Sequence, residues 1–130
     1  MATGSEDNVL FLSALTTDSG SGVRFWNMAR AGADAGWPVT FLERRPAGLP
    51  KRRHPCIEYR STPDSSGTAI GLVASVLRSL REGRRLAEER PWRAVYALKP
   101  LPNAVLPALR AARRGARIVL DVDDLDFEYY

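Results

Sequence analysis

The chain has 130 residues, of which 45% are hydrophobic and 26% are charged, and its formal net charge is +4. These proportions exclude a largely disordered chain, and no apolar run approaches the roughly 20 residues that a membrane-spanning helix needs. The one cysteine, Cys56, excludes an internal disulfide, and with the one histidine, His54, it makes no zinc site. We expect one folded domain over residues 8–130, preceded by a flexible lead-in over residues 1–7. Because that lead-in is polar and acidic, the sequence predicts no signal peptide and a cytoplasmic location.

The first predicted elements are a strand, a turn and a helix. The strand runs from about Asn8 to Leu15 and contains the apolar run Val9-Leu10-Phe11-Leu12, typical of a buried strand in a parallel sheet. A Gly/Ser turn over residues 16–22 separates it from a helix over about Val23 to Ala35, after which Gly36 suits the left-handed position. Glycines allow close approach of the backbone, and the unpaired N–H groups of a first helical turn attract anions. This pattern predicts a phosphate cradle formed by Ser19, Gly20, Ser21 and Gly22, the alternative being an ordinary tight turn.

A strand and a basic loop are predicted next. The second strand spans Trp37 to Leu42, and a proline-punctuated loop from Arg44 to Pro55 leads to a short third strand from Cys56 to Tyr59. The segment from Glu43 to Arg60 has six basic and two acidic residues, so it accounts for the whole net charge. Such a segment favours an anionic membrane surface or an anionic acceptor, the alternative being a solvated loop. No aromatic residue interleaves the run before Tyr59, so we expect no nucleic acid partner. The candidate contacts are Arg44, Arg45, Lys51, Arg52 and Arg53.

The rest of the chain alternates helices and strands. A long helix is predicted over about Thr68 to Arg90, ended by a proline, with the apolar residues Ile70, Val73, Leu77 and Leu80 on one face. The fourth strand spans about Arg93 to Leu98. After a turn that begins at Lys99, Asn103 is expected to be the N-cap of a helix that reaches Arg114, followed by Gly115 and a fifth strand over Arg117 to Val122.

Strands that alternate with helices predict an α/β fold, a Rossmann-like parallel sheet of about five strands flanked by helices. We expect the strand order 3-2-1-4-5, in which a ligand crevice lies at the carboxyl ends of strands one and four. This arrangement would bring the Gly/Ser turn, Lys99 and the acidic residues Asp121, Asp123 and Asp124 to one edge.

Several stretches in this order resemble a known family. They are the strand Val9–Leu12 with the turn Gly20-Ser21-Gly22, the segment Gly36-Trp37-Pro38-Val39-Thr40, and the fourth and fifth strands with their loops, Val95–Asn103 and Val119–Leu125. Together they resemble the N-terminal domain of a family 4 glycosyltransferase of the GT-B type. The resemblance covers nearly all of the chain, and its strength lies in the order of the segments.

The resemblance implies an enzyme that moves a sugar from a nucleotide-sugar donor to a sugar or lipid-linked acceptor with retention of configuration. It implies that this domain shapes the acceptor site and presents its glycine turn to the donor diphosphate. A C-terminal domain, in the same or another chain, would hold the nucleotide, so we expect this chain to be truncated and inactive alone. We expect no metal or other cofactor, and a location in the cytoplasm or at the inner face of the membrane.

The candidate catalytic residues are Lys99, Asp123 and Asp124. Lys99 is expected to meet a phosphate or an acceptor oxyanion, the alternative being a surface lysine paired with a carboxylate. Asp123 or Asp124 is expected to contact an acceptor hydroxyl or to position Lys99, with helix capping as the alternative. Asp121-Val122-Asp123 has the D-x-D form of metal-dependent GT-A enzymes, but any strand places such a pair on one face. The histidine that many family members carry after the fourth strand has no counterpart here.

Two other functions remain open from sequence. In a dinucleotide-binding oxidoreductase domain, Gly20 and Gly22 would open the helix and Glu43 would bind a ribose, although Phe25 occupies the place of the third glycine. In a non-catalytic binding module, the basic loop would recruit an anionic surface.

Overall fold

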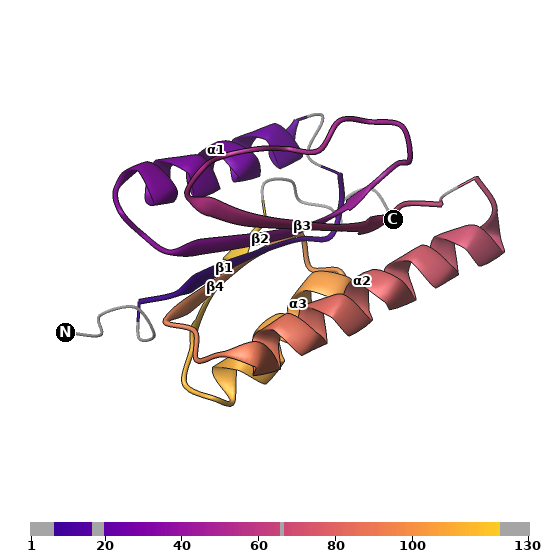
Figure 1. Cartoon of the computed structure of the whole chain (residues 1–130). Helices are drawn as coiled ribbons and strands as arrows, with labels where there is room; N and C mark the ends of the chain where they lie inside the picture. Colours follow the sequence, from indigo (N-terminus) through magenta and orange to yellow (C-terminus); the bar gives the residue numbers. More distant parts are fainter. Residues whose placement is uncertain (1–6, 17–19, 66, 123–130) are drawn as a thin grey trace.

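The computed structural model describes residues 7–16, 20–65 and 67–122. Within them, five parallel strands form one sheet of order β3-β2-β1-β4-β5, with helices on both faces (Figure 1). The predicted α/β class, Rossmann-like sheet and strand order are confirmed. The elements are β1 (Val9–Ser13), α1 (Ser21–Asp34), β2 (Val39–Arg45), β3 (Ile57–Pro63), α2 (Ala69–Glu89), β4 (Ala94–Leu98), α3 (Pro102–Ala112) and β5 (Arg117–Asp121).

One face of the sheet has an aromatic core beneath α1. Phe11 of β1 stacks on Tyr96 of β4 with ring centroids 4.6 Å apart, and Phe25 of α1 meets Phe11 edge-on at 5.3 Å. Trp26 of α1 meets the ring of Phe41 of β2 at 4.9 Å. Large rings therefore fill the space between α1 and the sheet, and buried aromatic pairs of this kind each add about 1 kcal/mol beyond their area burial.

The opposite face has a core of aliphatic and small side chains beneath α2 and α3 (Figure 1). Leu10 and Leu12 alternate with Val9 and Phe11 along β1, so each strand residue serves one layer. Trp92, before β4, closes this core and donates a hydrogen bond from its indole Nε1 to the carbonyl of Leu86 at 2.8 Å.

The orientation of α2 differs from the simplest interpretation of its periodicity. The residues expected to form one apolar face include Ile70, Val73 and Leu77, and these are 85%, 58% and 54% exposed. Facing inward instead are Ser75, Ser79, Gly83, Leu86 and Ala87. A Cβ on Gly83 would lie 2.7 Å from Cγ of Pro107, so the small residues of α2 are the ones that allow α3 to pack closely.

The start of α3 is also corrected. Asn103 is not the N-cap, because Leu101 occupies that position and Pro102 begins the helix, where its missing N–H costs nothing. The side chain of Asn103 is buried, and its Nδ2 donates to the carbonyl of Ala14 and to Oγ of Ser79, each at 3.2 Å. It therefore ties α3 to α2 and to the segment after β1.

Candidate functional site

The carboxyl ends of β1 and β4 mark the point where the strand order reverses, and α1 begins beside them. Gly20 is the N-cap of α1 and has φ +51°, in the left-handed region that glycine tolerates. Gly20 offers no side-chain oxygen to the first-turn N–H groups, which makes this terminus suited to an anion. Gly22 is buried and Ser21 is half-buried, whereas Ser19 lies outside the described residues.

Arg24 joins the first turn of α1 to the end of β5. Its Nη2 donates to Oδ1 of Asp121 at 2.6 Å, and the guanidinium remains about half exposed while the carboxylate is mostly buried. Oδ2 of Asp121 is buried and has no hydrogen-bond partner among the described residues. Arg24 is thus a cation held at the edge of the sheet, with a face left to solvent.

Lys99 lies at the same edge, directly after β4. Its backbone has φ +70°, which is uncommon for a residue other than glycine, and its N–H donates to the carbonyl of Asp121 at 3.0 Å. This hydrogen bond holds the residue after β4 beside the last residue of β5. The side chain of Lys99 is half-buried, and Asp123 and Asp124 lie outside the described residues.

We call Gly20, Ser21, Gly22, Arg24, Lys99 and Asp121 the switch-point edge. It combines a helix N-terminus and two cationic side chains with one carboxylate that holds Arg24. Such a combination favours a phosphate or diphosphate, with the carboxylate orienting the guanidinium rather than cancelling it. Arg24 was not among the residues selected from sequence; its position two residues after Gly22 is the signal that would have found it.

Glu43 is the buried centre of a polar cluster at the end of β2. Its carboxylate is fully buried and accepts hydrogen bonds from the hydroxyl of Tyr59 and from Nη1 of Arg45, the latter at 3.1 Å. Burial, and then the hydrogen bond to Glu43, raise the pKa of the Tyr59 phenol far above its ordinary value, so this donor keeps its proton. A carboxylate so enclosed is not placed to bind a ribose.

Arg44 and Arg45 were expected in an exposed loop, and this is corrected. Both lie in β2 and are buried, because β3 pairs with β2 as far as Arg45↔Pro63. Nε of Arg44 donates to the carbonyl of Ala14 at 3.0 Å, and Nε of Arg45 donates to the carbonyl of Pro50 at 2.7 Å. These two arginines therefore hold loops to the sheet and present no charge to a surface.

The remaining basic residues of the loop stay near the surface. Lys51 and Arg53 are exposed, and the guanidinium of Arg52 lies 5.9 Å from the ring centroid of Trp26 on α1. His54 Nε2 lies 2.7 Å from Oδ1 of Asp34 at the end of α1. The loop thus lies on the α1 side of the sheet.

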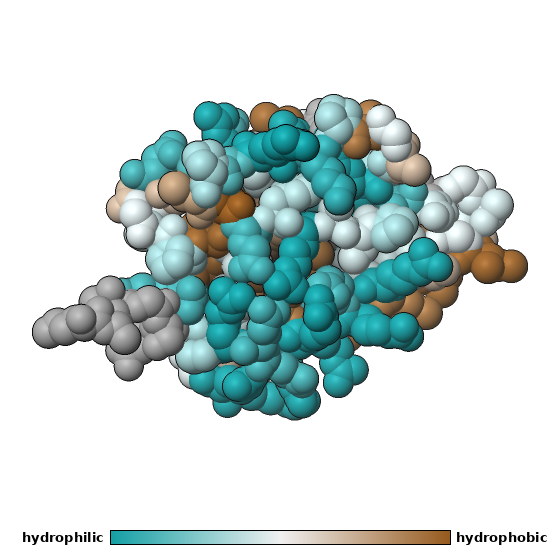
Figure 2. Space-filling model, in the orientation of Figure 1, coloured by the Kyte–Doolittle hydropathy of each residue, from teal (hydrophilic) through white to brown (hydrophobic). Residues whose placement is uncertain are grey.

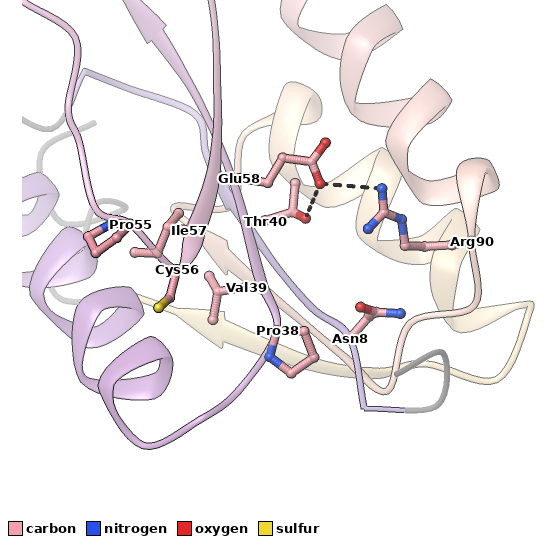
Figure 3. Close-up of a pocket in the computed structure, with 9 residues that line it drawn as sticks. All are labelled: Asn8, Pro38, Val39, Thr40, Pro55, Cys56, Ile57, Glu58 and Arg90. Carbon is pink, nitrogen blue, oxygen red and sulfur yellow. Dashed lines mark hydrogen bonds and ion pairs between the residues drawn. The ribbon is translucent and has the colours of Figure 1, made fainter. Parts of the chain in front are cut away.

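A pocket of about 370 Å³ lies at the opposite, amino-terminal edge of the sheet (Figure 3). Its polar groups satisfy one another, because Oε2 of Glu58 accepts from Oγ1 of Thr40 and from Nη2 of Arg90, each at 3.3 Å. Ligands of parallel α/β sheets bind at the carboxyl ends of the strands, so this pocket is not the candidate site.

The described residues contain neither a membrane-spanning helix nor a cluster of metal-ligating side chains. No helix there is long and apolar enough to cross a membrane. Likewise, no group of three or more His, Cys, Asp or Glu side chains in the described ranges is placed to hold a metal ion.

Comparison with known proteins gives structural similarity alone. No protein-family model and no curated protein matches the chain. Two crystal structures of the C-terminal domain of a hydrogenase from Pyrococcus furiosus are similar, with TM-scores of 0.64 and 0.65 and sequence identities of 15% and 14%. The matches cover 94% and 93% of this chain and 96% and 95% of those chains. At such identities they establish the shared α/β fold and nothing of the chemistry.

Proposed function

We propose that this chain is the acceptor-side domain of a glycosyltransferase, and that its switch-point edge receives the diphosphate of a nucleotide-sugar donor. The observation that carries the proposal is the convergence of the uncapped N-terminus of α1, Arg24 and Lys99 at the point where the strand order reverses. Glycosyl transfer leaves negative charge on the departing diphosphate, so fixed donors at this place lower the barrier.

The strand order and the stretches that resemble a family 4 glycosyltransferase agree with this role. In the proposed enzyme a C-terminal domain, in this or another chain, holds the nucleotide. Lys99 meets a donor phosphate or an acceptor oxyanion, and the role proposed for Asp123 or Asp124 is to bind an acceptor hydroxyl or to position Lys99. Retention of configuration and a sugar or lipid-linked acceptor belong to the same proposal.

The dinucleotide-binding alternative is disfavoured by two observations. The carboxylate of Glu43 is enclosed by Arg45 and Tyr59. Phe25 is fully buried and its ring separates α1 from β1, where the third glycine of a dinucleotide fingerprint would let helix and strand approach closely.

The test is an NMR titration of the ¹⁵N-labelled chain with UDP-glucose, GDP-mannose, inorganic pyrophosphate and NADH in turn. We expect the sugar nucleotides and pyrophosphate to shift the amide signals of Gly20, Ser21, Gly22 and Lys99. NADH binding at micromolar concentration, or no response of these amides to either sugar nucleotide at millimolar concentration, would overturn the proposal. A non-catalytic module would give the second result.

A further inference from the structure

The outer face of α2 carries large apolar side chains that nothing covers in the described structure. Ile70, Val73 and Leu77 recur at the spacing of one helical stripe and are more than half exposed. The opposite stripe, with Ser75 and Ser79, faces the sheet and α3. Large aliphatic side chains that are exposed side by side on one helix face mark a surface that binds a partner.

The outer face of α3 also carries exposed apolar side chains. Leu106 and Leu109 are 48% and 46% exposed. α3 runs in the same direction as the second half of α2, since Asn103 near the start of α3 bonds Ser79 in the middle of α2, and Arg110 pairs with Glu88 at 2.6 Å near the end of both helices. Leu106 and Leu109 therefore lie beside the second half of α2, and the apolar stripe of α2 extends beyond the start of α3. Figure 2 shows hydrophobic surface at the end of the molecule where α2 begins.

The same two stripes become basic toward their C-terminal ends. Arg81 and Arg84 follow Leu77 along α2 and are exposed, and Arg113 follows Leu109 beyond α3. A hollow of about 400 Å³ on α2 has both characters, because it is lined by Leu77, Leu80, Arg81, Arg84, Arg85 and Glu88.

The acidic residues of α2 do not neutralise this basic end. Glu82 pairs with Arg60 and Arg85, Glu88 with Arg110, and Glu89 with Arg60 and Arg90. The sequence of α3 contains no acidic residue. The outer stripe of α2, apolar at its start and positive toward its end, is complementary to the acyl boundary and phosphates of an anionic bilayer, and Leu106 and Leu109 of α3 add apolar surface beside its second half.

We propose that the outer face of α2 and α3 docks on the surface of an anionic lipid bilayer, with Ile70, Val73 and Leu77 entering the headgroup boundary and Arg81 and Arg84 meeting lipid phosphates. A second copy of the chain is a poorer occupant, because a two-fold contact would bring these arginines to a surface whose carboxylates are already paired. The docking face lies across the sheet from the 46–55 loop, so a flat membrane contacts one of the two surfaces and not both.

The experiment is flotation of the full chain with vesicles of phosphatidylcholine, with and without phosphatidylglycerol, at low and high salt. We expect binding that needs the anionic lipid and weakens with salt. The variant Ile70→Ser/Val73→Ser/Leu77→Ser should bind at least about tenfold more weakly, since loss of buried apolar area lowers interfacial affinity. Its matched control is Val23→Ser/Leu49→Ser, two exposed apolar residues outside the docking face, which should bind as the wild type does.

Charge reversal distinguishes the two basic surfaces. Arg81→Glu/Arg84→Glu should abolish the anionic preference, whereas Arg52→Glu/Arg53→Glu should leave most of it. The opposite pattern, or triple-variant binding equal to that of the wild type, would overturn the proposal. A third result would also overturn it: the wild type is a dimer in sedimentation velocity, the triple variant is a monomer, and neither protein floats with vesicles.

A second readout does not depend on the triple variant. In a Cys56→Ser background, Val73→Cys labelled with an environment-sensitive fluorophore should show a blue shift on adding anionic vesicles, and the label on Val23→Cys should not. Equal responses at both positions would contradict docking through α2. The proposal stands on α2 and α3 and not on the switch-point edge, so vesicle binding and nucleotide binding can fail separately.

Discussion

The guanidinium of Arg24, in the first turn of α1, lies 2.6 Å from the carboxylate of Asp121, at the end of β5. The two residues are 97 positions apart in the chain. Their contact joins the start of α1, which follows β1, to the end of β5 at the carboxyl edge of the sheet. The proposed diphosphate site depends on this pair, because Asp121 fixes where the cation of Arg24 lies.

Replacing Arg24 should weaken nucleotide-sugar binding and also lower the stability of the fold. We expect Arg24→Ala to lower the affinity for a sugar nucleotide by about tenfold, the loss of one charge-assisted hydrogen bond to phosphate. The free energy of unfolding should fall by about 1–3 kcal/mol, because the mostly buried carboxylate of Asp121 loses its guanidinium partner. Calorimetric titration and urea unfolding measure the two quantities.

The control for that prediction is Arg30→Ala, which removes an exposed arginine from the same helix away from the edge. Equal losses of affinity in the two variants would show a general charge effect and contradict a specific role for Arg24.

The buried cluster around Glu43 should be costly to disturb. Tyr59→Phe removes a hydrogen bond to a fully buried carboxylate, and we expect the free energy of unfolding to fall by about 1–3 kcal/mol. Glu43→Ala leaves Arg45 buried without its carboxylate partner and should cost about 3–5 kcal/mol. Urea unfolding followed by circular dichroism measures both.

Tyr96→Phe is the matched control for the tyrosine, because its ring packs on the same face of the sheet. A Tyr59→Phe variant as stable as Tyr96→Phe would show that the hydroxyl of Tyr59 does not hold Glu43. The raised pKa of Tyr59 also predicts that ultraviolet titration detects this phenol ionising last, or only on unfolding.

An ion-pair network between β3 and α2 should make stability depend on acid pH. Hydrogen bonds from arginines lower the pKa values of Glu58, Glu82 and Glu89 below the ordinary 4.5, the donors being Arg60, Arg85 and Arg90 in that order. A carboxyl whose pKa is lower in the folded state stabilises the fold above its unfolded pKa, and the contribution disappears as pH falls through the folded value. Stability should therefore decline as the pH drops below about 4.5.

Arg60→Met tests the network, because Arg60 pairs with all three carboxylates. We expect it to cost about 1 kcal/mol at neutral pH, with the difference from the wild type shrinking in acid. Arg93→Met, which breaks an exposed pair with Asp7, should cost little at any pH. A difference for Arg60→Met that stays constant down to pH values well below 4.5 would contradict the assignment.

Close packing between α2 and α3 predicts that Gly83 is intolerant of a methyl group. A Cβ there would lie 2.7 Å from Cγ of Pro107, so Gly83→Ala should destabilise by about 1–3 kcal/mol despite its higher helix propensity. Gly67→Ala, where a Cβ meets no atom within 4 Å, should be neutral or slightly stabilising. Thermal unfolding of both variants checks this, and equal melting temperatures would contradict tight contact between the helices.

The fold was predictable because short apolar runs mark β1, β4, β5 and the first half of β2, and each strand is separated from the next by a helix or a loop. The errors arose where tertiary contacts override local pattern. The apolar stripe of α2 is predicted to face inward, but the stripe of small residues packs against the sheet and α3 instead. Ser79 accepts a hydrogen bond from Asn103, and Gly83 packs against Pro107. Similarly, the charges of Arg44 and Arg45 predict exposed side chains, whereas both side chains are buried and donate hydrogen bonds to the carbonyls of Ala14 and Pro50.

The site was predictable only in part. Strand order alone places Gly20, Gly22 and Lys99 at one edge, so sequence could find them. The pairing of Arg24 with Asp121 could not be found from sequence, because it depends on where the first turn of α1 lies over the sheet and on a residue almost a hundred positions away.

The division of the core into two layers gives each layer its own optical reporter. Trp26 lies in the aromatic layer under α1, and Trp92 lies in the aliphatic layer under α2, while Trp37 is partly exposed. Variants that replace Trp37 and keep only one of the two buried indoles would emit from one side of the sheet alone. The loosening of α1 and that of the α2/α3 pair could then be followed as separate fluorescence signals within one small protein.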